Sequence, residues 1–278
     1  VPTSGADFPV VVLVHGSGPN DMDETIGESR PFRDIAWGLA SKGIAVLRYD
    51  KRTNVHGSSL PSDLGLEDEV EADALYALET ARERPETDPA RVFLLGHSLG
   101  GIMAPEVGRR DGNLAGIAIL AAPVRPFFDV FTEQLEYISS LEADPESPAR
   151  IQLDSLIQVV RSMEAGEVPD QETVLGAAPP YWRELASVDP VSTARELGTP
   201  LLVLQGGRDY QATTQDLSVW QEALGTKEGF SSKLYPDLNH LFAPGEGRAT
   251  PEEYTEGVQH VAEEVIRDLA TWVFGIVR

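Results

Sequence analysis

Six short runs of mainly apolar residues, separated by longer stretches with helical periodicity, limit what this 278-residue chain can fold into. The six runs cover residues 9–15, 43–49, 91–95, 114–120, 200–205 and 232–235. Most of them are apolar at successive positions, so both faces of the predicted strands are buried, as in a parallel sheet covered by helices. The pattern predicts an α/β fold in which a mostly parallel sheet is flanked by helices.

The stretches between these runs carry the predicted helices. Helical periodicity that ends near Gly or Pro is found in residues 31–41, 66–84 and 100–110, and a closing amphipathic helix is predicted for residues 250–278. Residues 126–190 break the rhythm, because they contain no strand-like run and are rich in Glu, Leu and Ile at helical spacing. We expect a helical cap, residues 126–189, inserted into a core formed by residues 1–125 and 190–278.

The size of the chain suits one main domain with such an insertion, since 41% of its residues are hydrophobic and can bury a full core. No run of 18 or more apolar residues is present, so no membrane span is expected. The first predicted strand begins close to Val1, whereas a sheet of this kind usually has two or more strands before it. We therefore expect further N-terminal strands in the native protein, and localisation stays open, with the cytoplasm slightly favoured.

Acidic residues outnumber basic ones by 45 to 22, which gives a formal net charge of −23. A polyanion repels nucleic acid and anionic membrane surfaces, so neither is an expected partner. Only four of the basic residues are lysines, a balance that proteins from a salty cytoplasm often show and that an ordinary acidic bacterial protein also fits. The absence of cysteine excludes disulfides, thiolate metal sites and a cysteine nucleophile.

The strongest chemical signal is the motif Gly96-His97-Ser98-Leu99-Gly100, which follows a predicted strand and precedes a predicted helix. A serine between glycines at such a turn is held in a strained backbone, with its hydroxyl projecting above the sheet. The motif alone is a weak signal that an incidental serine can produce, but the strand before it and the helix after it make it specific. Ser98 is the predicted nucleophile.

A serine hydroxyl needs a base to take its proton, and the chain has five histidines. His97 is expected to pack beneath the turn, His15 ends an early strand, His56 lies in a Gly/Ser-rich loop, and His260 is expected in the last helix. His240 follows a short strand late in the chain, after the nucleophile and the acid, which is the order that this fold requires of its base. His240 is therefore the predicted base.

The acid should follow a strand between Ser98 and His240, where it can accept the Nδ1 proton of the histidine. Asp209 lies in the loop that leaves the predicted strand 200–205. Asp216 is the competitor, and we expect it within the next helix or capping its start. Asp209 is the predicted acid.

The negative oxygen formed during acyl transfer needs two backbone N–H donors. We expect one from Leu99, at the start of a helix whose dipole favours negative charge, and one from Ser17 in the glycine-rich turn that follows His15. A plain glycine turn is the alternative reading of that second segment. Four aromatic residues of the predicted cap are expected to line an apolar substrate pocket: Phe127, Phe128, Tyr181 and Trp182.

No metal and no cofactor is predicted. The acidic loop at residues 21–24 lacks the glycine and the terminal glutamate of a calcium loop, so we expect a solvated turn there. No glycine-rich phosphate-binding string opens a helix.

Over almost its whole length the sequence resembles the α/β-hydrolase superfamily, and within it bacterial serine carboxylesterases near the dienelactone-hydrolase and serine-aminopeptidase groups. The blocks that carry the resemblance are HGSGPND (15–21), DETIG (23–27), RPFRDIAWGLA (30–40), RYDKRT (48–53), GHSLGG (96–101), PYWREL (180–185), LQGGRDYQ (204–211) and LNHLF (238–242). The resemblance implies a serine esterase that prefers short acyl chains, with Ser98, Asp209 and His240 as its triad. Dienelactone hydrolases themselves use a cysteine, which this chain lacks.

We therefore expect a carboxylic ester hydrolase that acts on a small-molecule ester through an acyl-enzyme, with a homo-oligomer as an open possibility. An aminopeptidase, a thioesterase or an acyltransferase on the same scaffold also stays open, because the pocket decides the substrate and the triad does not. A catalytically silent binding module is the alternative from a different class. The presence of all three triad residues argues against it.

Overall fold

One six-stranded sheet forms the centre of the protein, seen in a computed structural model that describes residues 1–60 and 63–276. Its strands lie in the order β2-β1-β3-β4-β5-β6, and each strand is parallel to its neighbours. They are β1 (Phe8–Val14), β2 (Ala45–Leu47), β3 (Thr87–His97), β4 (Gly116–Leu120), β5 (Leu201–Gly206) and β6 (Phe230–Tyr235). The predicted fold class, a parallel sheet flanked by helices, is confirmed.

The strand order reverses between β1 and β3. The chain runs from β1 to the edge strand β2, crosses back to β3 on the other side of β1, and then continues strand by strand to β6. In an open parallel sheet such a reversal leaves a crevice at the carboxyl ends of the strands, and ligands bind there. The residues that follow β1 and β3 are therefore the place where the fold favours a site.

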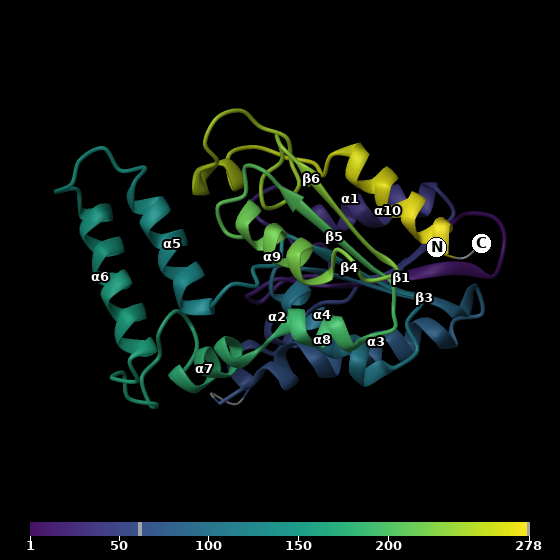
Figure 1. Cartoon of the computed structure of the whole chain (residues 1–278), viewed down its shortest axis with the longest axis horizontal. Coiled ribbons are helices and arrows are strands. Elements are labelled where there is room, and N and C mark those ends of the chain that lie inside the picture. Colours follow the sequence, from purple (N-terminus) through teal and green to yellow (C-terminus); the bar gives the residue numbers. More distant parts are fainter. Residues whose placement is uncertain (61–62, 277–278) are drawn as a thin grey trace.

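Helices cover both faces of the sheet (Figure 1). One face carries α1 (Pro31–Ser41) and α10 (Glu263–Ile276), and the other carries α3 (Ala72–Glu83), α4 (Leu99–Asp111), α8 (Pro190–Glu196) and α9 (Thr214–Leu224). A short helix α2 (Arg52–His56) and a 3₁₀ turn (Gly57–Ser59) follow β2, and a π turn (Glu67–Glu71) leads into α3.

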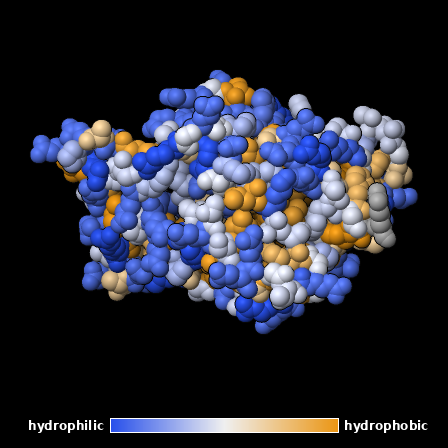
Figure 2. All heavy atoms as spheres, turned by 45° about the horizontal axis from the view of Figure 1, so that its top comes forward, coloured by the Kyte–Doolittle hydropathy of each residue, from blue (hydrophilic) through white to orange (hydrophobic). Residues whose placement is uncertain are grey.

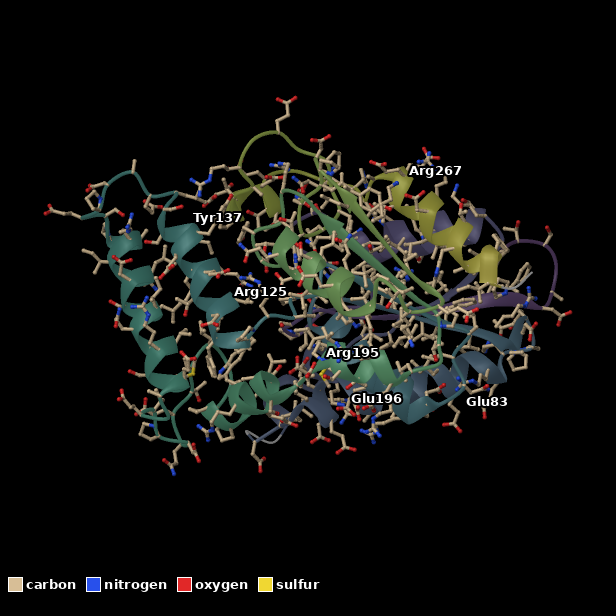
Figure 3. The ribbon with its side chains drawn as sticks, in the orientation of Figure 1. Glu83, Arg125, Tyr137, Arg195, Glu196 and Arg267 are labelled. Carbon is tan, nitrogen blue, oxygen red and sulfur yellow. The ribbon has the colours of Figure 1, made fainter. Side chains whose placement is uncertain are left out.

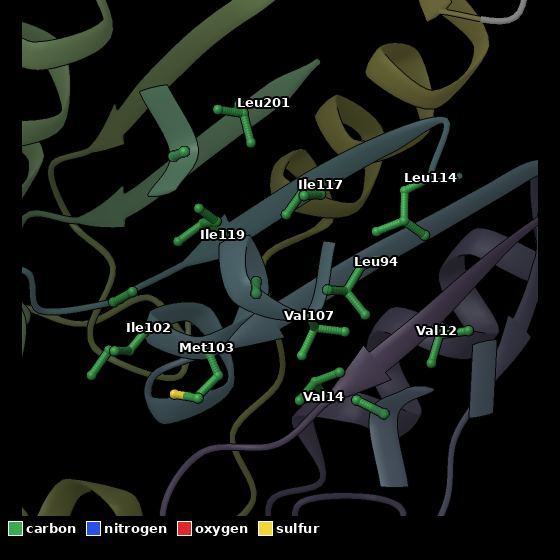
Figure 4. Close-up of a cluster of buried hydrophobic side chains, with 14 of the residues drawn as sticks. Val12, Val14, Leu94, Ile102, Met103, Val107, Leu114, Ile117, Ile119 and Leu201 are labelled. Carbon is green, nitrogen blue, oxygen red and sulfur yellow. The ribbon is translucent and has the colours of Figure 1, made fainter. Parts of the chain in front are cut away.

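The alternation of side chains along the strands divides the core into two layers. In β1, Val10, Val12 and Val14 pack with α3 and α4, whereas Val11 and Leu13 pack with α1 and α10. Figure 4 shows the first layer, where side chains of the strands meet those of α4. Strands that are buried on both faces need apolar residues at successive positions, which explains the apolar runs in the sequence.

Between β4 and β5 the chain leaves the sheet and forms three helices, α5 (Phe127–Ser139), α6 (Pro148–Glu164) and α7 (Pro179–Ser187). Helices α5 and α6 lie side by side at one end of the molecule, away from the sheet (Figure 1). They have an apolar cluster of their own, formed by Phe128, Leu135, Ile157, Val160, Met163 and Val174. All three helices lie within residues 126–189, for which the sequence predicts helices and no strand.

Helix α5 is joined to the core through the loops that follow β5 and β6. Gln134 donates a hydrogen bond to the carbonyl oxygen of Gln211 at 2.7 Å. The ring of Tyr137 stacks on that of Tyr210 with 4.8 Å between centroids, and its hydroxyl donates to the carbonyl oxygen of Ala249 at 2.7 Å. Figure 3 shows Tyr137 between α5 and the rest of the fold.

The closing helix is shorter than predicted. Instead of one helix over 250–278, the structure has a 3₁₀ turn at Pro251–Tyr254 and begins α10 only at Glu263. Gly257 has a φ of 82°, which is incompatible with a continuous α-helix. His260 therefore precedes the helix, with its Nδ1 2.9 Å from the Asp34 carboxylate, and residues 277–278 lie outside the described residues.

The surface reflects the polar composition. The face drawn in Figure 2 is largely hydrophilic, and its apolar side chains gather in small patches. Across residues 1–60 and 63–276, no helix is both long enough and apolar enough to cross a membrane.

Helix α4 lies so close to β1 that residue 100 has no room for a side chain. A Cβ on Gly100 would overlap the carbonyl oxygen of Val14 and lie 2.6 Å from that of His15. Both oxygens belong to the backbone, so no change of rotamer relieves the contact. We expect Gly100→Ala to lower the free energy of unfolding by roughly 1–3 kcal/mol, the usual cost of overpacking a core.

Gly198→Ala is the matched control, because a Cβ at that position has no heavy atom within 4 Å. Its effect should stay within about 0.5 kcal/mol. Denaturant unfolding of the three proteins measures both differences. Equal stability of Gly100→Ala and the unmodified protein would contradict the close approach of α4 to β1.

Candidate active site

A cavity of about 280 Å³ opens at the crevice between the carboxyl ends of β1 and β3. Gly16 and Ser17 follow β1, and Ser98 and Leu99 follow β3, so the strand order brings all four residues to one wall of the cavity. His240, from the loop after β6, joins the same lining. Residues of the 20–26 loop and of helices α4, α5 and α7 form most of the remainder, together with His97, Pro123 and Gln211.

Ser98 stands on a strained turn between β3 and α4. Its φ of 52° and ψ of −118° belong to a region that residues other than glycine rarely adopt. The turn is tight, since a Cβ on Gly96 would overlap the backbone of Gly100. Such a turn presents the serine hydroxyl above the end of the sheet, at the start of a helix.

The imidazole of His240 is paired with Asp209. Nδ1 of the ring lies 2.7 Å from Oδ2 of the carboxylate, and both side chains are buried. The carboxylate also accepts the backbone N–H groups of Gln211, at 2.7 Å, and Ala212, at 3.0 Å, and the side-chain amide of Gln205, at 3.1 Å. A carboxylate held in this way keeps the proton of His240 on Nδ1, which leaves Nε2 as the basic nitrogen.

Asp216, the competing acid, lies elsewhere. It forms a capping box with Thr213 at the start of α9, and its carboxylate accepts the backbone N–H groups of Val124, at 2.9 Å, and Arg125, at 3.2 Å. Its side chain is fully buried and pairs with the Arg125 guanidinium, which Figure 3 shows between α5 and the core. Asp216 therefore joins the loop after β4 to α9 and does not meet His240.

Three other histidines also lie apart from His240. His15 is buried between the rings of Phe32 and Tyr49, each 5.0 Å away, and burial lowers its pKa to about 4. His56 ends the helix α2, where the sequence predicts a loop, and His260 is exposed. A neutral, buried imidazole such as His15 packs as an aromatic ring at pH 7.

The two backbone amides predicted as oxyanion donors both border the cavity. Leu99 is the first residue of α4, so its N–H has no partner within the helix. Across the part of the chain that the structure describes, neither the N–H of Leu99 nor that of Ser17 has a protein acceptor. The N–H of Gly16, by contrast, is occupied, because it donates to Oε1 of Glu24 at 2.6 Å.

Glu24 is a site residue that the sequence prediction missed. Residues 21–24 are predicted to form a solvated turn, which is wrong for Glu24, since only 2% of its surface is exposed. Its Oε2 lies 3.0 Å from Nδ1 of His97, and Nε2 of His97 lies 3.0 Å from the carbonyl oxygen of His240. This buried pair therefore links the turn at Gly16 to the loop that carries His240.

The opposite charges of the pair favour its ionised form. Burial works against both charges, but the charge and hydrogen bond of the partner outweigh it, so the pKa of Glu24 is lowered and that of His97 is raised. A lowered carboxyl pKa gives stability that is lost as the pH falls through the folded value. A raised histidine pKa gives stability that is lost as the pH rises through the folded value.

Two of the four aromatic residues predicted for the pocket line the cavity. Phe127 and Trp182 do so, and their rings stack with 5.8 Å between centroids at 15°. Phe128 packs into the cluster between α5 and α6, because the next residue of a helix points about 100° away. Tyr181 lies outside the lining, where burial and the neighbouring Glu69 carboxylate raise its pKa.

Helix α5 contributes further lining residues that the sequence prediction did not name. Phe131 and Gln134 follow Phe127 by four and seven residues, which places all three on one helical face toward the cavity. The i, i+4, i+7 spacing of these three residues in the sequence could have indicated that they share one helical face. Within the described ranges, no group of three or more His, Asp or Glu side chains could hold a metal ion.

A serine on a strained strand-to-helix turn, followed along the chain by an aspartate and a histidine that pair, defines the α/β-hydrolase class. The family model described as the alpha/beta hydrolase family matches residues 11–269, and the chain belongs to this family. The membership that the sequence blocks predict is confirmed.

Two curated proteins and one solved structure are similar to this chain. Esterase EstD of Thermotoga maritima is 43% identical over 273 residues, which cover 98% of this chain and 64% of that protein, so the chain spans less than two thirds of the relative's length. A thiohydrolase of Arthrinium phaeospermum is 29% identical over 87% of this chain and 84% of that protein. Est1E of Butyrivibrio proteoclasticus, solved with ferulic acid bound, shares the fold with a TM-score of 0.62 at 15% identity, covering 98% of this chain and 90% of that one.

The pairing of His240 with Asp209 predicts which acid activates Ser98. A serine-directed organophosphonate should modify Ser98, and Asp209→Asn should slow that modification by a factor on the order of 10⁴, because the histidine then carries its proton on the wrong nitrogen. Peptide mapping by mass spectrometry locates the adduct, and its time course gives the rate.

Asp216→Asn is the control for this measurement. It removes a buried charge that caps α9 and should lower the thermal midpoint, while the rate of modification of folded protein stays within about threefold. A slower modification in Asp216→Asn than in Asp209→Asn would show that the acid has been misassigned.

Proposed function

We propose that this chain hydrolyses short-chain carboxylic esters through an acyl-enzyme formed on Ser98. The observation that carries the proposal is the meeting, at one cavity, of a serine on a strained turn and a histidine paired with a buried aspartate. The 43% identity with the Thermotoga esterase supports an ester as the substrate.

In the proposed reaction, Oγ of Ser98 attacks the ester carbonyl carbon while Nε2 of His240 takes the hydroxyl proton. Asp209 stabilises the imidazolium, and the N–H groups of Leu99 and Ser17 stabilise the oxyanion of the tetrahedral intermediate. The intermediate collapses when the C–O bond to the alcohol breaks and His240 returns the proton to the leaving oxygen. Water then attacks the acyl-enzyme by the same route and releases the carboxylic acid.

The bonding of Glu24, the acidic residue that lines the cavity, argues against an aminopeptidase. Such an enzyme needs a free carboxylate to bind the substrate's amine, but Glu24 is already engaged by the Gly16 N–H and by His97. A thioester is the second candidate substrate, because the Arthrinium relative is a thiohydrolase. The same triad attacks both carbonyls, so the leaving group and the pocket decide between them.

The test of the proposal is a panel of substrates offered to the unmodified protein and to Ser98→Ala. We expect hydrolysis of aryl esters with short acyl chains, weaker hydrolysis of an acyl-CoA and of an aminoacyl amide, and no turnover above background for Ser98→Ala. If Ser98→Ala keeps a tenth of the esterase activity, with its circular dichroism spectrum unchanged, Ser98 is not the nucleophile.

The residues at the boundary of the cavity support the preference for short chains. A second cavity of about 260 Å³ adjoins it, and the two share Ile102, Pro123, Phe127, Val130 and Leu185 in their linings. These five apolar residues lie between the two cavities and form a partition that would limit the length of the acyl chain. Trp182 stacks on Phe127 and donates through Nε1 to the carbonyl oxygen of Val174 at 2.9 Å, which fixes the partition in place.

Trp182→Ala should therefore move the chain-length optimum toward longer acyl groups. Each methylene that gains a buried place is worth roughly 0.8 kcal/mol, or about fourfold in kcat/KM. The measurement is kcat/KM for acetate, butyrate and octanoate esters, and the octanoate to acetate ratio should rise by at least tenfold.

Phe128→Leu is the matched control for the loss of an aromatic ring in the cap, because Phe128 packs in the cap cluster and does not line the cavity. It should lower the thermal midpoint without changing the ratio between esters. The same unchanged ratio in Trp182→Ala would mean that Trp182 only stabilises the cap.

A further inference from the structure

The carbonyl oxygen of Gly16 accepts two side-chain donors. Nζ of Lys51 lies 3.0 Å from it and Nδ2 of Asn20 lies 3.1 Å from it. This carbonyl and the N–H of Ser17 belong to the same planar trans peptide group, so they point in opposite directions. Whatever holds the carbonyl of Gly16 therefore sets the direction of the Ser17 N–H.

The turn at Gly16 lies directly beside the proposed nucleophile. A Cβ on Gly16 would lie 3.2 Å from Cβ of Ser98 and 3.2 Å from Oε1 of Glu24. Nζ of Lys51 lies on the carbonyl side of this peptide group, so the Ser17 N–H points away from Lys51. Gly16 and Ser17 both line the cavity, whereas Lys51 does not. Because Glu24 holds the N–H of Gly16, both peptide groups that flank Gly16 are fixed by buried charged side chains.

The burial of Lys51 is not explained by stability. Only 3% of its side chain is exposed, and Nζ pairs at 2.6 Å with Glu69, whose side chain is 9% exposed. Taking two charges out of water offsets most of their attraction, and buried ion pairs can often be replaced by neutral side chains without loss of stability. Neither Lys51 nor Glu69 lines the cavity, so neither is placed to bind a substrate there.

We propose that Lys51 is a positioning residue that directs the N–H of Ser17 at the oxyanion of the tetrahedral intermediate by binding the carbonyl of Gly16. Its positive charge also polarises that peptide group, and hydrogen bonds in a chain strengthen one another, so the Ser17 N–H becomes a stronger donor. Glu69 keeps the ammonium group in place. The inference rests on the proposed ester hydrolysis and adds a residue to its machinery.

Lys51→Met keeps the length of the side chain and removes its charge and its donors. Loss of one oxyanion donor lowers kcat by roughly 10²–10³, so a misdirected Ser17 N–H should lower kcat by about tenfold to a thousandfold. KM should stay within about twofold, because the donor acts on the oxyanion and not on the bound ester. Lys51→Gln, which keeps a donor amide, should lose less kcat than Lys51→Met.

Lys51→Met leaves the Glu69 carboxylate buried without its cation, which destabilises the fold. The double variant Lys51→Met/Glu69→Gln removes both charges and should recover most of the thermal midpoint. A kcat that stays low in this stable double variant supports the positioning role. A kcat that recovers together with the midpoint overturns it, and so does a rise in KM at unchanged kcat.

Arg82 and Asp111 provide the matched control, since their bidentate pair, at 2.6 Å, joins α3 to the end of α4 and neither residue lines the cavity. Arg82→Met/Asp111→Asn should shift the thermal midpoint and leave kcat within twofold. The two proposals fail differently. Hydrolysis by Ser98→Ala would overturn the proposed function, whereas an inactive Ser98→Ala beside a fully active Lys51→Met would overturn only the role of Lys51.

Discussion

The contact between Gly100 and the carbonyl groups at the end of β1 is the constraint on which the rest of the site depends. It lets α4 start against the end of the neighbouring strand, so the turn at Ser98 and the turn at Gly16 come within van der Waals distance of each other. These segments lie about eighty residues apart in the chain, and parallel pairing of β1 with β3 brings their ends to one edge of the sheet. The amides, the serine and the cavity all follow from that approach.

Around this contact the protein places charged groups where a core would normally be apolar. Glu24 with His97, Lys51 with Glu69 and Asp209 with His240 are three buried pairs at the carboxyl edge of the sheet. Each pair holds backbone groups of a loop as well as its partner, so the loops are fixed in direction although they lack regular structure. This order is obtained at the expense of desolvation, which the large apolar layers on both faces of the sheet offset.

Much of this arrangement could be predicted from the sequence, because strands buried on both faces leave apolar runs and because strand ends meet at one edge. The turn at Ser98 and the candidates His240 and Asp209 could be placed from their order along the chain and their positions after strands. Glu24 and Lys51 could not, since a buried charge follows no periodicity and most Glu and Lys side chains lie on the surface.

The helices show the same limit. Phe127 and Phe128 were both predicted to line the pocket, but only Phe127 lines the cavity, because the rotation of α5 about its axis relative to the core decides this and a helical pattern alone does not give it. The start of the helix predicted for residues 250–278 was misplaced because Gly257, which has a positive φ, lies within an otherwise amphipathic stretch. In the first case the rotation of one helix about its axis decided which residue lines the cavity. In the second case the φ angle of one glycine decided where the helix begins.

The attachment of α5 through Gln134 and Tyr137 has a consequence for how the insertion can change. Both side chains contact the 209–213 loop region that carries Asp209, so α5 is fixed to the segment that holds the acid. Helix α6 packs on α5 and the residues between them, 140–147, lie at the far end of the molecule (Figure 1). Lengthening the 140–147 connection would leave Asp209 and His240 undisturbed, because neither side chain contacts it, so this connection can change in length without altering the geometry of the site.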